Sequence, residues 1–288
     1  MPQISVVMPV YNGSKYIAEA IESVLKQSFD DFEFIIIDDG SNDETLFIIR
    51  SFKDRRITVI ENEHDFIDSL NKGINLASGK YIARMDADDI MHIDRLKVQN
   101  SIMEEESNIT ICGSWMIPFG DNMQAGQVIG VLSGVIEKPM IEMLKGNYLF
   151  PPTVMVRKHF LKSTNIQYER DYPYAEDYKL WFEIVKQGAV IYIESQPLLY
   201  YRVSEIQLSN VKSEEQKQTV GLIKREIIKW LMHRMPSEIK HCLIQLEEVL
   251  WQLEDFGVVG KGEVYQLFLK LFNKSQVDLN TQLNKLLT

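Results

Sequence analysis

The feature that most constrains the fold is a threefold alternation, within the first 85 residues, between short apolar runs and segments with apolar residues at helical spacing. The apolar runs predict strands at 4–8, 32–38, 57–60 and 81–85, and the spacing predicts helices at 16–26, 43–52 and 66–77. The run Phe32–Asp38 is almost continuously apolar, which is typical of a parallel strand buried on both faces. Repeated strand–helix units imply right-handed crossovers and an α/β sheet with helices on both faces.

Beyond residue 94 the alternation is less regular, and beyond residue 213 the pattern is helical throughout. The expected elements are helices at 94–106 and 176–187 and strands at 109–115, 127–132, 151–156 and 198–202. This change predicts a catalytic domain over 1–210, with halves 1–115 and 116–210, followed by a helical C-terminal region over 211–288.

Composition excludes several classes of protein. The chain has 288 residues and a formal net charge of -10, and the excess of acidic residues lies before residue 211, which argues against a nucleic-acid partner bound through a basic surface. No run approaches the ~18 apolar residues of a membrane-spanning helix, and Met1–Val10 lacks the basic start and cleavage site of a signal peptide. We therefore expect a cytoplasmic protein. Cys112 and Cys242 lie far apart in apolar contexts, which favours buried free thiols.

Three polar groups follow expected strands, at 9–12, 38–41 and 86–89. In open α/β sheets, ligands bind at the carboxyl ends of the strands, so these groups should meet at one edge. An aromatic ring beside a carboxylate suits a nucleobase, which stacks on the ring and donates an N–H to the carboxylate. Two carboxylates separated by one residue on a loop suit a divalent cation that keeps open coordination positions for phosphate oxygens. A solvated acidic face or a helix N-terminus is the simpler alternative for each group.

The same residues resemble a known family. Five motifs occur in order over about residues 3–210: ISVVMPVYN from Ile4, IDDGSND from Ile37, LNKG from Leu70, GKYIARMDADD from Gly79 and AEDY from Ala175. Together they resemble glycosyltransferase family 2. The resemblance implies a GT-A fold: a nucleotide-binding sheet flanked by helices, here followed by the helical region. It implies an inverting transferase that moves a sugar from a nucleoside diphosphate, expected to be UDP, to an acceptor hydroxyl.

The resemblance also implies roles for residues around the nucleotide. Tyr11 and Asp39 match positions that hold the base, Pro9 matches a backbone contact beside it, and Arg84 matches a position that faces the nucleotide. The structural alternatives are a packing role for Tyr11, a turn-forming role for Asp39 and a salt bridge for Arg84. Each alternative would leave the fold unchanged.

The remaining roles concern metal and catalysis. Asp86 and Asp88 match the family's Asp-x-Asp, with Asp88 ligating Mg²⁺ or Mn²⁺ and Asp86 near the ribose or a metal-bound water; Asp89 is expected to hold the loop or cap the next helix. Asp177 matches the general base, which must lie on the face of the sugar opposite the leaving diphosphate. The alternative for Glu176 and Asp177 is that they cap a helix.

Two positions depart from the family pattern. Ser204 follows Tyr201-Arg202-Val203 where a histidine is common, and Pro151 stands where the family often has another histidine. These losses motivate a rival reading, a degenerate nucleotide-sugar binding or scaffolding protein. A nucleotidyltransferase is disfavoured because no Gly-rich, Lys-bearing loop follows the first strand.

The segment 222–235 combines one apolar face with interspersed basic residues. Such a helix can lie on an anionic membrane, pack on the catalytic domain or pair with a second subunit. Many members of the family act on lipid-linked acceptors, so the resemblance also implies a saccharide or lipid-linked acceptor, in the assembly of a polysaccharide or glycolipid at the inner face of the cell membrane.

Overall fold

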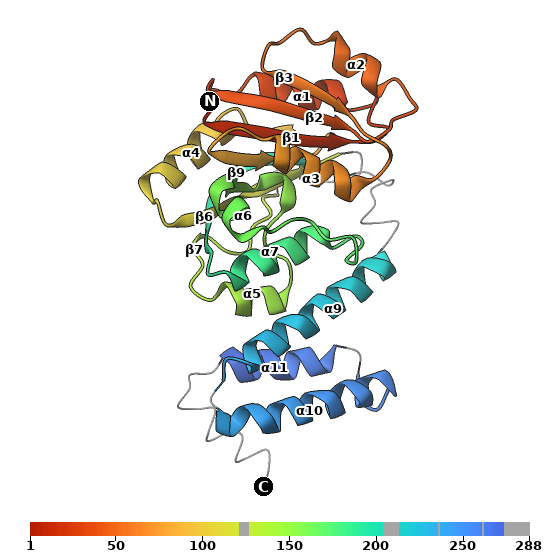
Figure 1. The fold of residues 1–288 in the computed structure, drawn as a ribbon, viewed down its shortest axis with the longest axis vertical. Coiled ribbons are helices and arrows are strands. Elements are labelled where there is room, and N and C mark those ends of the chain that lie inside the picture. The colour runs from red at the N-terminus through yellow and green to blue at the C-terminus, as the bar shows by residue number, and fades with distance from the viewer. Residues whose placement is uncertain (121–126, 204–212, 236, 261, 274–288) are drawn as a thin grey trace. The chain divides into compact units, whose positions relative to one another are not determined.

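The computed structural model describes the chain except for residues 121–126, 204–212, 236, 261 and 274–288. Within the described residues the strands form one mixed sheet in the order β3-β2-β1-β4-β8-β6-β9-β5, with β7 paired to β9 (Figure 1). The strands are β1 Ile4–Val10, β2 Phe32–Asp38, β3 Ile57–Glu61, β4 Tyr81–Arg84, β5 Ile90–Met91, β6 Ile109–Phe119, β7 Gly134–Val135, β8 Met155–Arg157 and β9 Val190–Arg202. The predicted α/β fold class is thus confirmed.

Helices alternate with the strands up to β9, and the described residues after β9 contain helices but no strand. They are α1 Ile17–Leu25, α2 Thr45–Ser51, α3 Phe66–Leu76, α4 Arg95–Glu105, α5 Pro139–Lys145, α6 Lys158–Thr164, α7 Glu176–Lys186, α9 Ser213–Met232, α10 Ser237–Asp255 and α11 Glu263–Asn273, with a 3₁₀ turn at Pro151–Thr153. Every helix expected before residue 190 is present within a few residues of its predicted bounds.

The parallel half of the sheet brings the polar strand ends together. β1 pairs in parallel with β2 and β4, and β2 pairs in parallel with β3. All seven residues of β1 are buried, as expected for a strand covered on both faces. Helix α3 packs closely on β1, because a Cβ added at Gly73 would lie 2.3 Å from Val7 Cγ1. The ends of β1, β2, β3 and β4 therefore meet at one edge.

Three expected strands differ from the structure, one in its existence and two in their bounds. Residues 127–132 form only an isolated bridge between Ile129 and Met116, and Gly130 lies against the Trp115 ring, where a Cβ would approach it within 2.2 Å. The strand expected from residue 151 starts at Met155, because Pro151 and Pro152 lack the N–H groups of a strand and open a 3₁₀ turn instead.

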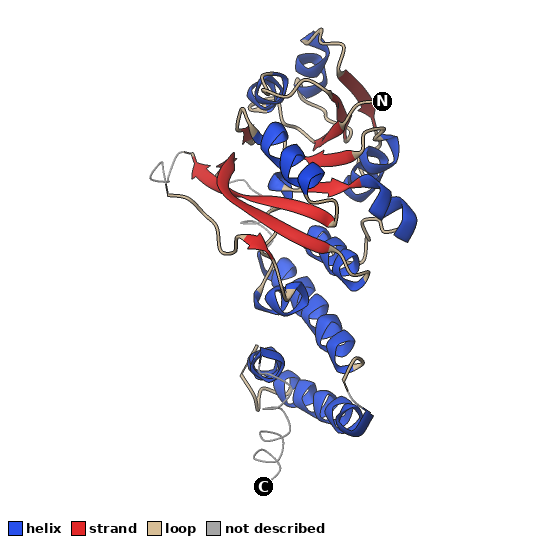
Figure 2. Ribbon diagram, turned by 90° about the vertical axis from the view of Figure 1, so that its left-hand side faces the viewer, coloured by secondary structure: helices blue, strands red, loops and turns tan. Residues whose placement is uncertain are grey.

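The third difference is the length of the last strand, which runs over Val190–Arg202 rather than 198–202. It pairs with β6, in parallel, through register shifts near Trp115, opposite Pro197. The exposed Ser195 and Gln196 hid this continuity from the pattern. Figure 2 shows the two long strands side by side.

The chain divides into two compact units, residues 1–137 with 148–216, and residues 138–147 with 217–288. The expected boundary near residue 210 and the halves of the first domain stay predictions, since the second unit also takes in α5. Within that unit Ile223, Ile227 and Phe268 are buried, and Arg225 pairs with Asp255 at 3.1 Å. Among the described residues no helix is both long and apolar enough to span a bilayer.

Candidate functional site

The ends of β1 and β2 place Tyr11 and Asp39 next to each other. Asp39 N donates a hydrogen bond to Val10 O at 2.7 Å, which joins the end of β1 to the residue after β2. Pro9 lies in β1 opposite Ile37, and Tyr11 follows it with 44% of its surface exposed. The structure therefore brings these predicted nucleobase residues to one edge.

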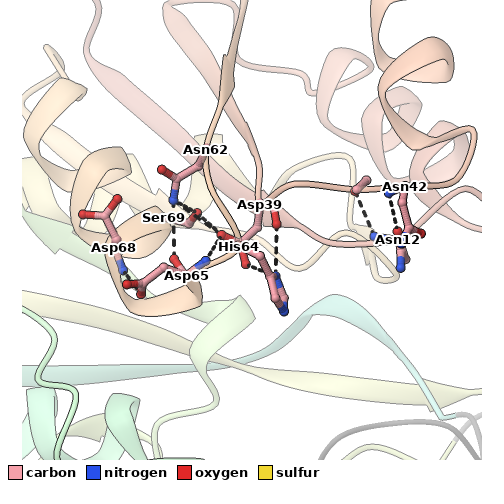
Figure 3. Close-up of polar contacts among 9 residues, drawn as sticks. Asn12, Asp39, Asn42, Asn62, His64, Asp65, Asp68 and Ser69 are labelled. Atoms are coloured by element: carbon pink, nitrogen blue, oxygen red, sulfur yellow. Dashed lines mark hydrogen bonds and ion pairs between the residues drawn. The ribbon is translucent and has the colours of Figure 1, made fainter.

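The loops after β1 and β2 are joined through Asn12, Ser41 and Asn42. Asn12 N donates to Ser41 Oγ and Asn42 N donates to Asn12 Oδ1, each at 2.9 Å (Figure 3). Asn12 has a φ of 48°, a left-handed conformation that asparagine tolerates better than most residues. Two hydrogen bonds between backbone N–H groups and side-chain oxygens thus join the loop that carries Tyr11 to the loop after β2.

The Asp39 carboxylate is enclosed by the segment that follows β3 and by the start of α3. Its side chain is 1% exposed. Oδ1 accepts hydrogen bonds from Ser69 Oγ at 2.6 Å and from Asp65 N at 2.9 Å, and Oδ2 lies 3.0 Å from His64 Nδ1 (Figure 3). Asp65 also caps α3 by accepting from Asp68 N. Both oxygens of the carboxylate that was expected to receive the base thus already contact polar groups of the protein.

His64 was missed in the sequence. Its ring stacks on Tyr11 with centroids 4.0 Å apart and an interplanar angle of 26°. The signal that could have found it is the rule already applied to three other strand ends: His64 lies three residues beyond the end of β3, and β3 is adjacent to β2.

The end of β4 carries the acidic loop. Carboxylate oxygens of Asp86, Asp88 and Asp89 all lie within 4.8 Å of one another. Burial and the neighbouring charge of Asp86 raise the pKa of Asp88 to about 6. Burial and the charges of Asp86 and Asp88 also raise the pKa of Asp89. The three carboxylates are therefore packed closely enough to disfavour full ionisation without a counter-charge.

Arg202, at the end of β9, holds this loop and was given no role in the sequence analysis. Arg202 N donates to Asp89 Oδ1 at 2.8 Å, and its Nε donates to Asp88 O at 2.7 Å. Its guanidinium also pairs with Glu19 and lies over the rings of Tyr16 and Phe119. Asp89 therefore holds the loop, as one of its two expected roles required.

The acidic loop fits a divalent cation. Within the described residues Asp89 Oδ2 is buried without a hydrogen-bond partner, and hard cations such as Mg²⁺ take oxygen ligands from carboxylates. A bound cation would relieve the repulsion that raises the pKa of Asp88. Asp86 and Asp88 are partly exposed and are the residues that would hold it, while Asp89 is buried next to them.

Arg84 connects the acidic loop with the start of α7. It is 9% exposed and forms an ion pair with Asp86. Burial opposes its charge, but Asp86 and Asp177 outweigh that effect and raise the pKa of Arg84. The structural salt bridge considered for Arg84 therefore exists, and the guanidinium lies among the carboxylates of the predicted site.

Asp177 lies in the first turn of α7 and is 9% exposed. Burial raises its pKa, whereas the charge of Arg84 and hydrogen bonding with Tyr168 lower it. Asp177 Oδ1 is buried with no hydrogen-bond partner among the described residues. Burial and the charge of Asp177 raise the pKa of Glu176 to about 7. The α7 N-terminus thus holds an acidic pair in which burial raises both pKa values, that of Glu176 to about 7.

The remaining predicted positions lie elsewhere. Pro151 opens the 3₁₀ turn, and Ser204 lies outside the described residues. Cys112 is a buried free thiol, and burial raises its pKa to about 12, so it takes no part in the site. Cys242 lies in α10, but its side chain is outside the described part of the structure.

Comparison with known proteins now decides the family. The sequence model described as "Glycosyl transferase family 2" matches residues 5–167. The chain belongs to glycosyltransferase family 2. It is 32% identical to an uncharacterized glycosyltransferase of Haemophilus influenzae, over 94% of this chain and 87% of that protein. It is also 30% identical, over 74% of this chain and 82% of the relative, to the Escherichia coli UDP-Glc:alpha-D-GlcNAc-diphosphoundecaprenol beta-1,3-glucosyltransferase WfgD.

Solved structures support the fold of this glycosyltransferase. The Staphylococcus aureus TarS 1–349 structure in complex with UDP-GlcNAc matches with a TM-score of 0.66 and 22% identity, over 88% of this chain and 73% of that chain. Another structure of the same TarS fragment matches with a TM-score of 0.63 and 22% identity, over 83% of this chain and 68% of that chain. The expected GT-A fold is confirmed.

Proposed function

We propose that this glycosyltransferase moves a sugar from a UDP-sugar to an acceptor hydroxyl with inversion at the anomeric carbon. The observation that carries the proposal is the position of Arg84, whose charge interacts with Asp86 of the acidic loop and with Asp177 of α7. An inverting displacement needs a group that binds the leaving diphosphate and a base for the acceptor hydroxyl, and here an acidic loop and a buried carboxylate interact with the same cation.

The donor would bind along the strand ends. In this proposal Pro9, Tyr11 and Asp39 form the nucleobase end, while Arg84 and Asp86 lie toward the ribose and diphosphate. Asp88, with Asp86, would hold Mg²⁺ or Mn²⁺, which when bound offsets negative charge on the leaving diphosphate. The E. coli relative is named as a transferase that uses UDP-Glc, and together with the TarS complex with UDP-GlcNAc it supports a UDP donor.

Asp177 is the proposed general base. It would accept the acceptor's hydroxyl proton as that oxygen attacks the anomeric carbon and the bond to the diphosphate breaks. Burial raises its pKa, which makes the carboxylate a stronger proton acceptor, while Arg84 and Tyr168 favour its charged form.

The acceptor is proposed to be a saccharide or a lipid-linked saccharide, with the enzyme acting in polysaccharide or glycolipid assembly. The E. coli relative carries a diphosphoundecaprenol-linked acceptor in its name, which supports this class. We further propose a cytoplasmic enzyme, with the C-terminal helices offering the contact to the inner face of the membrane or to a second subunit.

The test is calorimetric titration of the full chain with UDP, with and without Mn²⁺, followed by an assay of donor hydrolysis and of transfer to lipid-linked acceptors. We expect Mn²⁺ to increase the affinity for UDP and turnover to follow. Metal-dependent binding without any turnover would instead support the binding-protein alternative that Ser204 and Pro151 motivated.

A further inference from the structure

The motifs LNKG, from Leu70, and AEDY, from Ala175, are connected in the structure through Tyr168, which lies in neither of them. Asn71 of the first motif holds the Tyr168 backbone, and the Tyr168 side chain hydrogen-bonds with Asp177 of the second. We propose that Asn71 is a positioning residue, which acts through Tyr168 on the orientation of Asp177. This inference rests on the proposed function, in which Asp177 is the general base.

The contact between Asn71 and Tyr168 is made in both directions. Asn71 Nδ2 donates a hydrogen bond to Tyr168 O at 3.0 Å, and Tyr168 N donates to Asn71 Oδ1 at 2.9 Å. A side-chain amide has both a donor and an acceptor, so it can pair with the N–H and the C=O of one backbone position. In the described part of the chain, the Tyr168 backbone makes no hydrogen bond to another backbone group. Asn71 therefore satisfies both polar groups of this backbone position.

Tyr168 lies in the segment 165–175, between α6 and α7, which contains neither helix nor strand. The same segment contacts the start of α3 through the ion pair of Arg170 with Asp65. Those two side chains are 61% and 40% exposed, and exposed pairs contribute little to stability. The hydrogen bonds of Asn71 are partly buried, so they are the stronger link between this segment and α3.

The Tyr168 side chain and the face of α7 that carries Asp177 meet at one cavity. Tyr168 lines this cavity together with Arg84 of β4 and with Leu180 and Trp181 of α7. Leu180 and Trp181 follow Asp177 by three and four residues, so they share its face of the helix. Tyr168 is 7% exposed. Its hydroxyl is thus enclosed next to Asp177 and the guanidinium that interacts with it.

The hydrogen bond of Tyr168 can orient the carboxylate of Asp177. Burial raises the pKa of Tyr168 well above its ordinary value, so the hydroxyl keeps its proton and donates. Arg84 and Asp86 act on Asp177 through charge, whereas a hydrogen bond depends on direction as well as distance. Asp177 Oδ1 has no hydrogen-bond partner among the described residues. Since a general base must lie within reach of the proton that it accepts, the orientation of this carboxylate affects the rate.

The experiment measures kcat of the full chain with Mn²⁺, UDP-Glc or UDP-GlcNAc and lipid-linked acceptors, and the affinity for UDP by calorimetry. We expect Tyr168→Phe and Asn71→Ala each to lower kcat about tenfold, the equivalent of one hydrogen bond, with UDP affinity within twofold of the wild type. Because both changes act on the same hydrogen bond, the double variant should also lose about tenfold rather than a hundredfold.

Two further variants complete the set. Asn71→Asp has the shape of asparagine and keeps the acceptor for Tyr168 N but lacks the donor to Tyr168 O. It should lower kcat in the wild type and have no effect in Tyr168→Phe. Asn75→Ala is the control, because Asn75 is an exposed asparagine one turn further along α3. It should keep the kcat of the wild type.

The inference is overturned if Asn71→Ala keeps the kcat of the wild type, if it weakens UDP binding as much as it lowers kcat, or if the losses multiply in the double variant. The proposed function stands in each of these cases, provided that Asp177→Asn abolishes transfer. A wild type that transfers no sugar, or an Asp177→Asn variant that transfers within threefold of the wild type, would overturn both.

Discussion

Arg84 forms an ion pair with Asp86, two residues further along the chain, although only 11% of the arginine side chain is exposed. Breaking a buried pair by removing one partner costs about 3–5 kcal/mol, since an uncompensated charge remains. We expect Arg84→Met to lower the free energy of unfolding by about 3 kcal/mol at pH 8, measured by urea denaturation. The loss should be smaller at pH 5, where protonation of the neighbouring carboxylates relieves their repulsion.

Arg50→Met is the control for Arg84→Met. Arg50 also pairs with a carboxylate, Glu61, but both side chains are more than half exposed. Exposed pairs contribute about 0–1 kcal/mol. Equal losses in the two variants would show that Arg84 is not needed to balance the buried acids.

Asp177→Asn should remove the proposed general base without disturbing the donor site. General base catalysis contributes about 10²–10⁴ in rate, so we expect transfer to fall about a thousandfold while the affinity for UDP changes less than twofold. The exposed Asp171→Asn, in the loop before α7, is the control and should keep full activity. Transfer within threefold of the wild type in Asp177→Asn would assign the base to another residue.

Tyr168→Phe tests how the charge on Asp177 is held. Hydrogen bonding with Tyr168 lowers the pKa of Asp177, against the effect of burial. Without the hydroxyl the charged form is less favoured and the pKa of Asp177 rises. The acid limb of the pH profile of kcat/KM should therefore move to higher pH, with a larger loss of activity at pH 6 than at pH 8. A uniform loss at every pH would indicate a packing role alone.

The acidic loop predicts a pH-dependent response to Mn²⁺. Burial and Asp86 raise the pKa of Asp88 to about 6, so the folded state holds this proton more tightly than the unfolded state does. The stabilising effect of that protonation is complete below pH 4 and is lost as the pH rises through 6. Metal ligands must be deprotonated, so Mn²⁺ should raise the Tm more at pH 7.5 than at pH 5.

Asp88→Asn is the control for this response. It removes one ligand and the group that titrates, so we expect a smaller Mn²⁺ effect on the Tm with little difference between the two pH values. Equal Tm shifts at pH 5 and pH 7.5 in the wild type would mean that the cation binds away from Asp88.

Much of the fold could be predicted because its parallel half follows local patterns. β2 occurs at the predicted Phe32–Asp38, since a strand buried on both faces is almost continuously apolar. The long β9 was predicted only in part. Its first half pairs with β6 across shifts in register. Pro197 and its polar neighbours interrupt the apolar pattern by which a strand is predicted. Such a strand is maintained by pairing with distant residues, which a local pattern does not contain.

The candidate site was predicted only as far as the strand ends that carried recognisable motifs. Asp39 and Tyr11 lie together because β1 and β2 are neighbours, which the order of βα units suggests. The contacts of His64 with Tyr11 and Asp39 depend on β3 being the outer neighbour of β2, and on the turn after β3 folding back over Asp39. Arg202 reaches the acidic loop from a strand more than a hundred residues away, so only the tertiary structure reveals it.

Gly40 allows the turn after β2 to approach His64. Its φ is +79°, and a Cβ there would lie 3.2 Å from His64 N. A left-handed conformation costs about 1–2 kcal/mol for residues other than glycine. We expect Gly40→Ala to lower the free energy of unfolding by at least this amount and also to weaken the binding of UDP, because the turn carrying His64 must shift.

Gly188→Ala separates the two effects of Gly40→Ala. Gly188 has a similar φ of +83°, but a Cβ there would meet no atom within 4 Å. Gly188→Ala should therefore show the backbone strain alone, with a loss of about 1 kcal/mol in urea denaturation and no change in the affinity for UDP. If Gly40→Ala weakens UDP binding no more than Gly188→Ala does, the contact between Gly40 and the His64 backbone does not position the base-binding residues.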